Sequence, residues 1–304
     1  MEKHASIDIG TNSTRLLIVE RRGKGKLSPL LHEERITRLG EGLGKSGELA
    51  PASMERVIDA VLEYNEIISA NHIRQVRIVA TSAVRDARNR SLFLDALSER
   101  TGRTCHVISG AEEARLTYLG VFSDFPADTN AIVIDVGGGS TEYIVATGGV
   151  MHTKISIDIG SRRLSERFFA SDPVTDTEFD AFQKYVRAQL APKLENFPRE
   201  TFLGIAVGGT ASTLAQVQSS LAESLFEQIH LMEITRNKLI QMVADFRSRT
   251  IEQRRKIVGL NPKRADVILA GAAILAESLE MLNLSAITVS LRDLLFGVLL
   301  TDDL

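Results

Sequence analysis

The first 35 residues contain three short runs of apolar and β-branched residues, at 5–9, 15–20 and 27–33. Gly10-Thr11-Asn12-Ser13 separates the first two runs, and Gly23-Lys24-Gly25-Lys26 precedes the third. Short runs joined by turn-forming residues predict a meander of three strands. The segments that follow alternate in type, and they predict a helix around 54–68, a strand over 76–80, a helix over 86–100, a strand over 104–108 and a helix from Ser109 to about Val121.

The meander pattern begins again at Ala131. A predicted strand over 131–135 ends in Asp135, a glycine-rich turn follows it, and further strands are predicted over 142–146 and 151–157. Asp8 and Asp135 occupy equivalent places, 127 positions apart. Because the two segments share the three-strand register as well as the turn, we interpret them as an internal duplication.

Strands and helices alternate in the second half as well. The predicted elements are a helix over 175–197, a strand over 202–207, a helix that opens at Gly208, nearly continuous helix over 234–282, a strand over 286–289 and a last apolar helix. Strands that alternate with helices predict two α/β domains. No linker rich in proline, glycine or serine separates the halves, so we expect a tight hinge near 121–130 and a ligand in the cleft between the domains.

Composition narrows the class of protein. Of the 304 residues, 44% are hydrophobic and 25% are charged, which excludes a disordered or low-complexity chain. No apolar run approaches the ~20 residues of a membrane-spanning helix, and no signal peptide fits before the first strand, so we expect no membrane association. The single Cys105 excludes an internal disulfide and favours the cytoplasm. A net charge of −3 gives no support for nucleic-acid binding, although a local basic patch could hold another polyanion.

Three loops have the composition of phosphate cradles. Glycines let backbone N–H groups approach phosphate oxygens, and neighbouring polar side chains add donors. Each loop alone is more often a tight turn, but all three follow strands, and the last one opens a helix whose amino terminus favours an anion. The predicted phosphate-binding residues are Thr11, Asn12 and Ser13, then Gly137, Gly138, Gly139, Ser140 and Thr141, and finally Gly208, Gly209 and Thr210.

Two aspartates end hydrophobic strands, where a charged side chain is costly unless it is paired or bound to a cation. Phosphate chemistry usually recruits Mg²⁺ through one or two carboxylates together with water and phosphate oxygens. Glu142 leaves the same loop as Asp135 and could face the same space, or it could be a solvated strand residue. We therefore predict a Mg²⁺ site at Asp135 and Glu142, with Asp8 as a further candidate ligand.

A carboxylate and an arginine are the candidate catalytic residues. Ser109 and Glu112 form a capping-box pattern in which Glu112 reaches back to the backbone. Glu113, about a hundred degrees further round the helix, has no such local role and is the better candidate to deprotonate an attacking water. Arg85 follows the strand over 76–80 and could bind a phosphoryl group through two donors. The structural alternative for Glu113 is a surface ion pair with a neighbouring arginine.

Two further segments mimic phosphate loops. The segment over 40–46 resembles a P-loop, but it is one residue short and no apolar strand precedes it. The segment over 156–161 repeats the sequence around Asp8, but it lies where the third strand of the second meander should end, so Asp158 is not expected to bind metal. The six histidines have no metal-ligand spacing, and the sequence shows no nucleophile for covalent catalysis.

Seven segments in order resemble the Ppx/GppA phosphatase family, the exopolyphosphatases and guanosine pentaphosphate phosphohydrolases. They contain the residues discussed above and run nearly from end to end of the chain. The segments are Ile7–Ser13, Arg38–Leu43, Ala80–Ala87, Ile108–Arg115, Ile134–Glu142, Val207–Thr210 and Gly259–Asp266.

The resemblance implies an α/β fold with two ribonuclease-H-like domains of the sugar kinase, heat-shock chaperone and actin superfamily around a central cleft. It implies an amino-terminal domain over 1–124, a second domain over 125–290, and a carboxy-terminal helix over about 291–304 that packs back on the first. The family's essential glutamate falls on Glu113 and its phosphate-binding arginine on Arg85. Its metal-site carboxylates fall on Asp135 and Glu142, with Asp8 a looser ligand through water.

The chain departs from the family near its carboxy terminus. Where the family usually has Gly-Leu-Arg-Glu-Gly, this sequence reads Asp293-Leu294-Leu295-Phe296-Gly297. The usual arginine and glutamate become Leu295 and Phe296, so we expect the last helix to serve packing alone. The length of 304 residues corresponds to the short, two-domain form of the family, which favours shorter polyphosphate substrates.

These inferences together predict a Mg²⁺-dependent exopolyphosphatase that releases orthophosphate from inorganic polyphosphate. The family resemblance favours a homodimer. The alternatives are a guanosine pentaphosphate 5′-phosphohydrolase, a non-catalytic alarmone or nucleotide sensor, and a sugar-kinase-like phosphotransferase. A long polyanion would need a basic track, and each candidate for it could equally be a solvated surface residue. The candidates are Arg162, Arg163, Arg254, Arg255, Lys256, Lys263 and Arg264.

Overall fold

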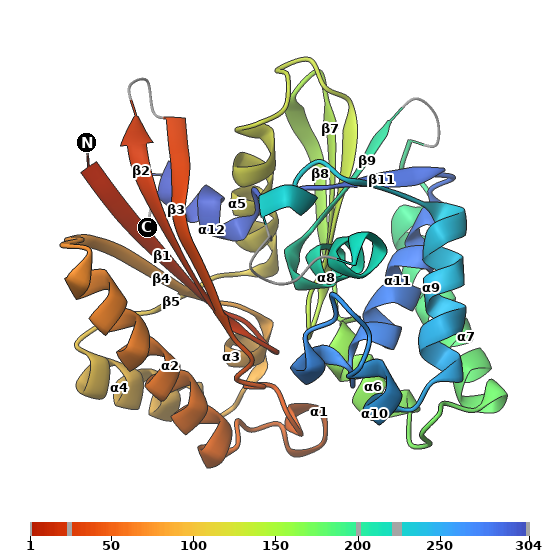
Figure 1. Cartoon of the computed structure of the whole chain (residues 1–304), viewed down its shortest axis with the longest axis horizontal. Coiled ribbons are helices and arrows are strands. Elements are labelled where there is room, and N and C mark those ends of the chain that lie inside the picture. Colours follow the sequence, from red (N-terminus) through yellow and green to blue (C-terminus); the bar gives the residue numbers. More distant parts are fainter. Residues whose placement is uncertain (1, 23–25, 199–201, 221–226, 302–304) are drawn as a thin grey trace. The chain divides into compact units, whose positions relative to one another are not determined.

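The computed structural model describes residues 2–22, 26–198, 202–220 and 227–301. The chain divides into two compact units, of which unit 1 comprises Met1–Asp124 and Arg292–Leu304, and unit 2 comprises Phe125–Leu291. Each unit is a mixed β-sheet with helices (Figure 1), which confirms the predicted α/β class.

The sheet of unit 1 has the strand order β3-β2-β1-β4-β5. The first three strands form the predicted antiparallel meander, and β4 and β5 continue the sheet parallel to β1. The strands are β1 (Glu2–Ile9), β2 (Thr14–Arg22), β3 (Lys26–Arg35), β4 (Gln75–Ala80) and β5 (His106–Val107). The helices are α1 (Leu43–Ser46), α2 (Pro51–Ala70), α3 (Ser82–Asp86), α4 (Arg90–Thr101), α5 (Gly110–Phe122) and α12 (Leu294–Leu300).

Alternation along β1 and β2 sorts their side chains onto two faces of the sheet. Ile7 and Ile9 belong to the core formed with α2 and α4, whereas Leu17 and Val19 pack against Leu295 and its neighbours in α12. Helix α12 also packs closely on α5. Asp8 therefore lies on the same face as Ser6, whose hydroxyl donates a hydrogen bond to the carbonyl of Leu295 at 2.9 Å.

The sheet of unit 2 repeats this plan in the order β10-β11-β9-β6-β7-β8, with β6 to β8 as the second predicted meander. The strands are β6 (Ala131–Val136), β7 (Thr141–Thr147), β8 (Val150–Ile157), β9 (Leu203–Val207), β10 (Glu233–Thr235) and β11 (Ala286–Val289). The helices are α6 (Ser161–Phe168), α7 (Asp176–Leu194), α8 (Gly208–Ser219), α9 (Arg236–Ser248), α10 (Ile251–Arg254), the 3₁₀ helix η2 (Pro262–Arg264) and α11 (Ile268–Met281).

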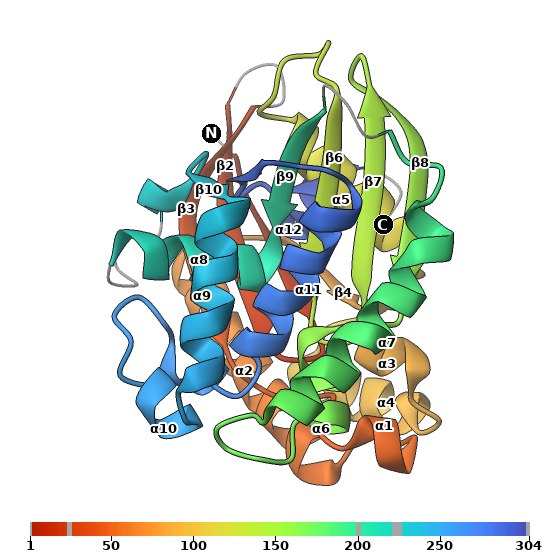
Figure 2. The ribbon, with the colours of Figure 1, turned by 90° about the vertical axis from the view of Figure 1, so that its right-hand side faces the viewer.

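The core of unit 2 lies between one face of its sheet and the helices that cover it. Ile132, Ile134 and Phe182 are buried there, and α11 lies between α9 and α7 on this face (Figure 2). Helix α11 is buried along almost its whole length, which explains why its sequence is apolar with no polar stripe. None of the helices in the described ranges has both the length and the apolar character needed to cross a lipid bilayer.

Two predictions of secondary structure are wrong in detail. The helix predicted over 86–100 is interrupted, because Ala87 is extended and the side-chain amide of Asn89 hydrogen-bonds to both backbone groups of Leu49. The segment over 234–282 begins with β10, a three-residue edge strand paired antiparallel to β11, before its helices start. Both deviations depend on contacts with distant parts of the chain, which local spacing does not encode.

Candidate active site

Asp8 lies at the carboxyl end of β1 and is only 5% exposed. Its partner across the antiparallel pair is Arg15 of β2, which donates to Asp8 Oδ2 from Nη2 at 2.6 Å and from Nε at 3.2 Å. Burial raises the pKa of Asp8, and the neighbouring guanidinium opposes that rise. Asp8 Oδ1 is also buried, and within the described ranges it has no hydrogen-bond partner. One oxygen of this carboxylate therefore binds Arg15, and the other is left without a hydrogen-bond partner among the described residues.

The loop after β1 is held from two sides. Its turn is closed by a hydrogen bond from Gly10 N to Ser13 O at 2.9 Å, and the hydroxyls of Thr11 and Ser82 lie 2.7 Å apart. The carbonyls of Thr11 and Asn12 accept hydrogen bonds from the backbone of the 38–40 segment, both at 2.9 Å. Ser82 begins α3, which carries Arg85 in its last turn, so the predicted phosphate loop and the predicted phosphate-binding arginine are mechanically linked.

The structure brings Arg85 and Glu113 together. Arg85 Nη1 donates to Glu113 Oε2 at 3.2 Å and to the carbonyl of Ile108 at 2.9 Å. Glu113 lies in the first turn of α5, where Ser109 caps the helix through the backbone N–H of Glu112, and it is 8% exposed. The carboxylate of Glu112 instead binds Arg115 on the same helix. The surface ion pair considered as an alternative for Glu113 is thus a largely buried pair with the other catalytic candidate.

In unit 2, Asp135 of β6 and Glu142 of β7 are direct cross-strand partners. Directly opposed residues project from the same face of a sheet, with Cβ atoms about 5 Å apart, so Glu142 does face the same space as Asp135. Both side chains are buried, and Glu142 Oε1 accepts a hydrogen bond from Ser156 at 2.6 Å. Two carboxylates this close inside a protein repel each other unless a proton or a cation lies between them.

The loop over 137–141 repeats the turn of unit 1, with Gly137 N donating to Ser140 O at 3.0 Å. The carbonyls of Gly137, Gly138 and Gly139 all accept hydrogen bonds from the start of α6, including one from Arg163 Nε at 2.7 Å. The acceptors of the loop are thus engaged by α6. The Thr141 hydroxyl donates to the carbonyl of Ile159 at 2.6 Å, so its proton is not free for a phosphate.

Two glycines at the start of α8 permit close approaches that no other residue would allow. Gly208 has a φ of 77°, and a Cβ there would lie 2.3 Å from Asp135 Oδ1. A Cβ on Gly209 would lie 2.2 Å from a guanidinium nitrogen of Arg264. The Thr210 hydroxyl donates to the carbonyl of Val136 at 2.8 Å. The backbone at this helix start therefore touches both a predicted metal ligand and a buried arginine, which suits it to an anion bound together with a cation.

The donor chemistry of these residues fits Mg²⁺. No group of three or more histidine, cysteine, aspartate or glutamate side chains gathers as a metal site in the described part of the chain. Mg²⁺ does not need such a closed cage, because it usually binds one or two carboxylates and keeps waters or phosphate oxygens as its other ligands. The paired carboxylates of Asp135 and Glu142 supply the small number of ligands that Mg²⁺ needs, and Asp8 is a further carboxylate of the same chemistry.

The basic residues proposed for a substrate track do not all lie on the surface. Arg254 is 2% exposed and donates to the carbonyls of Phe246 and Ala265, so its assignment to a track is wrong. Arg162 is also buried and binds Asp266 at 2.9 Å. A long arginine side chain can be drawn inward wherever carbonyls or carboxylates satisfy its donors, and residue type alone does not reveal this.

The sequence analysis missed two members of the site. Arg15 stands 127 positions before Glu142, and the duplicated register could have identified it as the cross-strand neighbour of Asp8. Asp293 belongs to the segment that departs from the family pattern, and its carboxylate binds Arg15 Nη1. Leu295 and Phe296 are buried in the core as expected, but the prediction that this segment serves packing alone is wrong, because Asp293 takes part in a buried ion pair.

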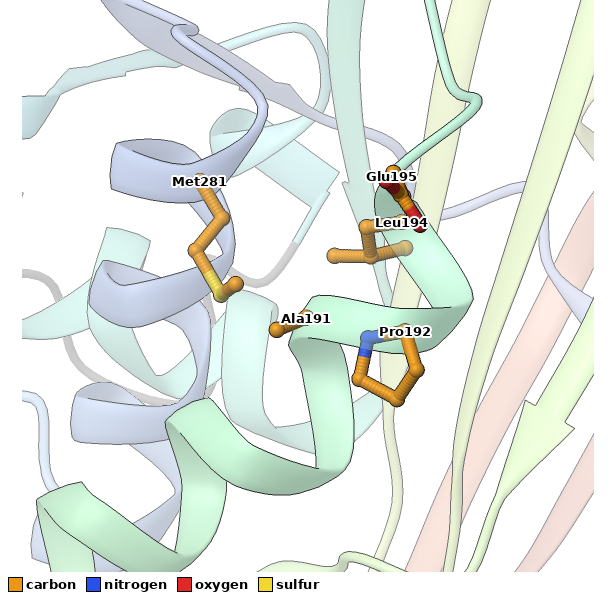
Figure 3. Close-up of a pocket in the computed structure, with 5 residues that line it drawn as sticks. All are labelled: Ala191, Pro192, Leu194, Glu195 and Met281. Carbon is orange, nitrogen blue, oxygen red and sulfur yellow. The ribbon is translucent and has the colours of Figure 1, made fainter.

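Two other features in the described part of the chain, the Cys105 thiol and a surface pocket of unit 2, lack the chemistry of a phosphate site. Burial raises the pKa of the Cys105 thiol to about 12, which keeps it protonated and unreactive. A surface pocket of 460 Å³ in unit 2 lies beside the ends of α7 and α11 (Figure 3). Its lining residues are apolar except for Glu195, and none of the predicted site residues is among them.

Known proteins related to this chain share one phosphatase family. The family model for the Ppx/GppA phosphatase family matches residues 7–303. Exopolyphosphatase 2 of Mycobacterium tuberculosis is 37% identical, with 98% of this chain and 97% of that protein covered. The bifunctional 3-dehydroquinate synthase/phosphatase of Fusobacterium nucleatum is 34% identical over 97% of this chain and 46% of its own length.

Solved structures show the same fold. A Ppx/GppA family member from Aquifex aeolicus has a TM-score of 0.81 at 32% identity, covering 98% of this chain and 96% of its own. An exopolyphosphatase from Cytophaga hutchinsonii has a TM-score of 0.89 at 28% identity, with the same coverage. The chain therefore belongs to the Ppx/GppA phosphatase family and is a hydrolase that acts on phosphoanhydride bonds.

Proposed function

We propose that this protein is an exopolyphosphatase, which hydrolyses the terminal phosphoanhydride bond of inorganic polyphosphate with Mg²⁺ and releases orthophosphate. The similarity to Exopolyphosphatase 2 over nearly the whole chain supports this substrate class. The observation that carries the proposal is the largely buried ion pair between Arg85 and Glu113, in which Nη1 of the guanidinium lies 3.2 Å from Oε2 of the carboxylate. A phosphoanhydride hydrolase needs both groups, one for the water and one for the phosphoryl oxygens.

Glu113 is the residue that orients and deprotonates the attacking water. The water oxygen forms a bond to the terminal phosphorus, the bond from that phosphorus to the bridging oxygen breaks, and the proton of the water passes to the Glu113 carboxylate. The leaving group is polyphosphate shortened by one unit. Burial of Glu113 limits competing solvent around this proton transfer.

Arg85 binds the oxygens of the terminal phosphoryl group and offsets their charge. Its guanidinium carries five N–H donors, and the bonds to Glu113 and to the carbonyl of Ile108 come from Nη1 alone. The remaining edge of the guanidinium can bind a phosphate through two parallel hydrogen bonds while the contact with Glu113 is kept. The same contact thus fixes the water-activating carboxylate and the phosphoryl-binding arginine relative to each other.

Asp135 and Glu142 of unit 2 would hold Mg²⁺, and Asp8 of unit 1 is a further candidate to bind a divalent cation through water. When bound, the cation withdraws charge from phosphate oxygens. The backbone N–H groups of the loops over 11–13, 137–141 and 208–210 would bind further phosphate oxygens. The Thr141 and Thr210 hydroxyls are engaged with carbonyls, so these two residues would contribute through their backbone.

The test is phosphate release from polyphosphates of defined length, from about three units to several hundred, with Mg²⁺ and with excess chelator. We expect release of orthophosphate without the fragments that cleavage inside the polyphosphate chain would produce, and loss of the activity when the cation is removed. We expect higher rates on the shorter chains. No release from any polyphosphate would refute the proposal.

Guanosine pentaphosphate is the second substrate to test, because the matched family is named for both activities. The same assay run in parallel with this nucleotide compares the two values of kcat/KM. A clear preference for the nucleotide would make the protein a 5′-phosphohydrolase. Binding of the nucleotide without turnover, together with inertness toward polyphosphate, would favour a sensor.

We also propose that the protein works in the cytoplasm as a homodimer, which the family resemblance and the single cysteine support. Light scattering coupled to size-exclusion chromatography measures the mass directly. A mass near the 33.3 kDa of one chain at micromolar concentration would refute the dimer.

A further inference from the structure

Arg15 is shared between two buried carboxylates that come from opposite ends of the chain. Its Nε and Nη2 both bind Asp8 Oδ2, and its Nη1 binds Asp293 Oδ2. The side chains of Arg15, Asp8 and Asp293 are 11%, 7% and 7% exposed, so the three groups form a nearly solvent-free cluster.

The way Arg15 meets Asp8 is unusual for an isolated pair. A guanidinium and a carboxylate usually meet through two parallel hydrogen bonds that use both carboxylate oxygens. Here both donors converge on Oδ2, and Asp8 Oδ1 stays buried with no partner in the described ranges. The third interaction of the guanidinium, from Nη1 to Asp293, gives the group a second anchor that fixes its orientation against Asp8.

The cluster also contains more negative than positive charge. Two carboxylates face one guanidinium, and an uncompensated charge in a buried position is costly. A cation near the open oxygen of Asp8, bound directly or through water, would remove that cost.

We infer that Asp293 is a positioning residue, which holds the Arg15 guanidinium on one oxygen of Asp8 and so keeps the other oxygen available to a divalent cation or its bound water. This inference rests on the proposed role of Asp8 toward Mg²⁺. Without the Asp293 carboxylate, Arg15 can turn to engage both oxygens of Asp8, and the cation loses a ligand.

The backbone of Asp293 is fixed independently of its side chain. Its carbonyl lies so close to Gly120 of α5 that a Cβ there would be 2.1 Å away, and it accepts a hydrogen bond from Gly297 N at 3.1 Å. The Oδ1 atom of Asp293 caps α12 by accepting from Leu295 N at 3.0 Å. Asparagine and serine are also good caps, so Asp293→Asn and Asp293→Ser remove the charge while the end of α12 stays in place.

The experiment measures Mn²⁺ binding to the substrate-free protein by electron paramagnetic resonance, and the Mg²⁺ concentration that gives half-maximal phosphate release. For Asp293→Asn and Asp293→Ser we expect the Mn²⁺ dissociation constant and the half-maximal Mg²⁺ concentration to rise by about five- to tenfold, or about 1–1.4 kcal/mol. The value of kcat at saturating Mg²⁺ should stay within about twofold of wild type. Asp124→Asn is the matched control, because it removes another carboxylate of unit 1, one that binds Arg292, the residue that precedes Asp293. It should leave both cation measurements unchanged.

Asp8→Asn supplies the second control. If Asp293 acts through Arg15 on Asp8, Asp293→Asn has no further effect on Mn²⁺ binding in the Asp8→Asn background.

A variant that lowers the thermal midpoint and kcat while the cation measurements stay at wild-type values would show a purely structural role and overturn the inference. Wild-type protein that hydrolyses polyphosphate but binds no Mn²⁺ would overturn it as well. Wild-type protein that binds Mn²⁺ but releases no phosphate would refute the proposed function alone, and the comparison of variants would still decide the inference.

Discussion

The first two strands of the meanders in unit 1 and unit 2 match residue by residue at an offset of 127 positions, and the third strands pair with the same register relative to them at an offset of 122. The turn from Gly10 N to Ser13 O in unit 1 recurs as the turn from Gly137 N to Ser140 O in unit 2. The irregularity in β2 falls between Ile18 and Val19, and that in β7 falls between Val145 and Ala146, at the equivalent place. A β-bulge repeated at the same register is a specific feature, so the two units share detailed geometry as well as strand order.

The main chemical difference lies directly across from the strand-end aspartate. In unit 1 the partner of Asp8 is Arg15, and in unit 2 the partner of Asp135 is Glu142. The same backbone therefore carries an ion pair in one unit and two adjacent carboxylates in the other. A cation gains more from two carboxylates than from one that an arginine already neutralises. Unit 2 thus has the stronger predicted metal ligands, whereas unit 1 has the carboxylate and arginine for acid–base and phosphoryl binding.

The largest expected effect on activity comes from replacing Glu113, the proposed general base in unit 1. Glu113→Gln keeps the volume and can still accept a hydrogen bond from Arg85, but it cannot take a proton from water. We expect kcat to fall by about 10³-fold or more with little change in thermal midpoint. Glu112→Gln is the control, because Glu112 is the preceding residue on α5 and binds Arg115 instead. Turnover by Glu113→Gln within tenfold of wild type would remove Glu113 from the mechanism.

The next effect tests the comparison of the two aspartates directly. Asp135→Asn should lower kcat/KM by about 10²- to 10³-fold, since a first ligand of the cation is lost. Asp8→Asn should cost about tenfold, the usual effect of a group that supports a metal site less directly. Both are measured as phosphate release over a range of Mg²⁺ concentrations. Equal losses, or a larger loss for Asp8→Asn, would contradict the inference that unit 2 has the stronger metal ligands.

A smaller effect is expected at the glycine that lets α8 approach Asp135. Gly208→Ala places a Cβ 2.3 Å from Asp135 Oδ1 and should lower activity by about tenfold or more through the displaced carboxylate. Gly148→Ala is the matched control in unit 2, since Gly148 also has a positive φ but no atom lies within 4 Å of its added Cβ. Both variants should lose about 1 kcal/mol of stability from the backbone conformation. Only Gly208→Ala should lose activity as well. Equal activity in the two variants would show that the close approach of α8 to Asp135 has no effect on the metal site.

The sequence was sufficient for the repeated features of the fold. Short apolar and β-branched runs joined by glycine-rich turns predicted both meanders. The position of Glu142 on the strand that leaves the loop after Asp135 predicted that the two side chains could face the same space, as their cross-strand pairing shows. These features depend on local pattern and on cross-strand pairing across a short turn, which the turn itself largely determines.

Long-range contacts could not be predicted in this way. Asp293 meets Arg15 from 278 residues further along the chain, and Asn89 interrupts a helical pattern by binding Leu49. Arg254 has the sequence signature of a surface cation, yet it is buried because three backbone carbonyls accept its hydrogen bonds. In each case a polar side chain finds a partner that only the folded chain brings near, and hydrophobic periodicity carries no record of that partner.

The smallest expected effect concerns how a carboxylate in each unit contributes to the stability of the fold as the pH falls. Backbone and side-chain hydrogen bonds at the Thr175 cap of α7 lower the pKa of Glu178 to about 2, whereas burial raises the pKa of Asp8. A lowered pKa stabilises the fold above the unfolded value of 4.5, and that contribution is lost as the pH falls from 4.5 toward 2. Glu178→Gln should therefore lower the free energy of unfolding at pH 7 by less than about 1 kcal/mol, because the group is exposed. The difference from wild type, measured by thermal or denaturant unfolding, should shrink toward zero near pH 2. Asp180→Asn removes an exposed carboxylate from the same helix and should show no such convergence. A difference for Glu178→Gln that stays constant from pH 7 to pH 2 would show that the cap works by shape alone and not by the charge of the carboxylate.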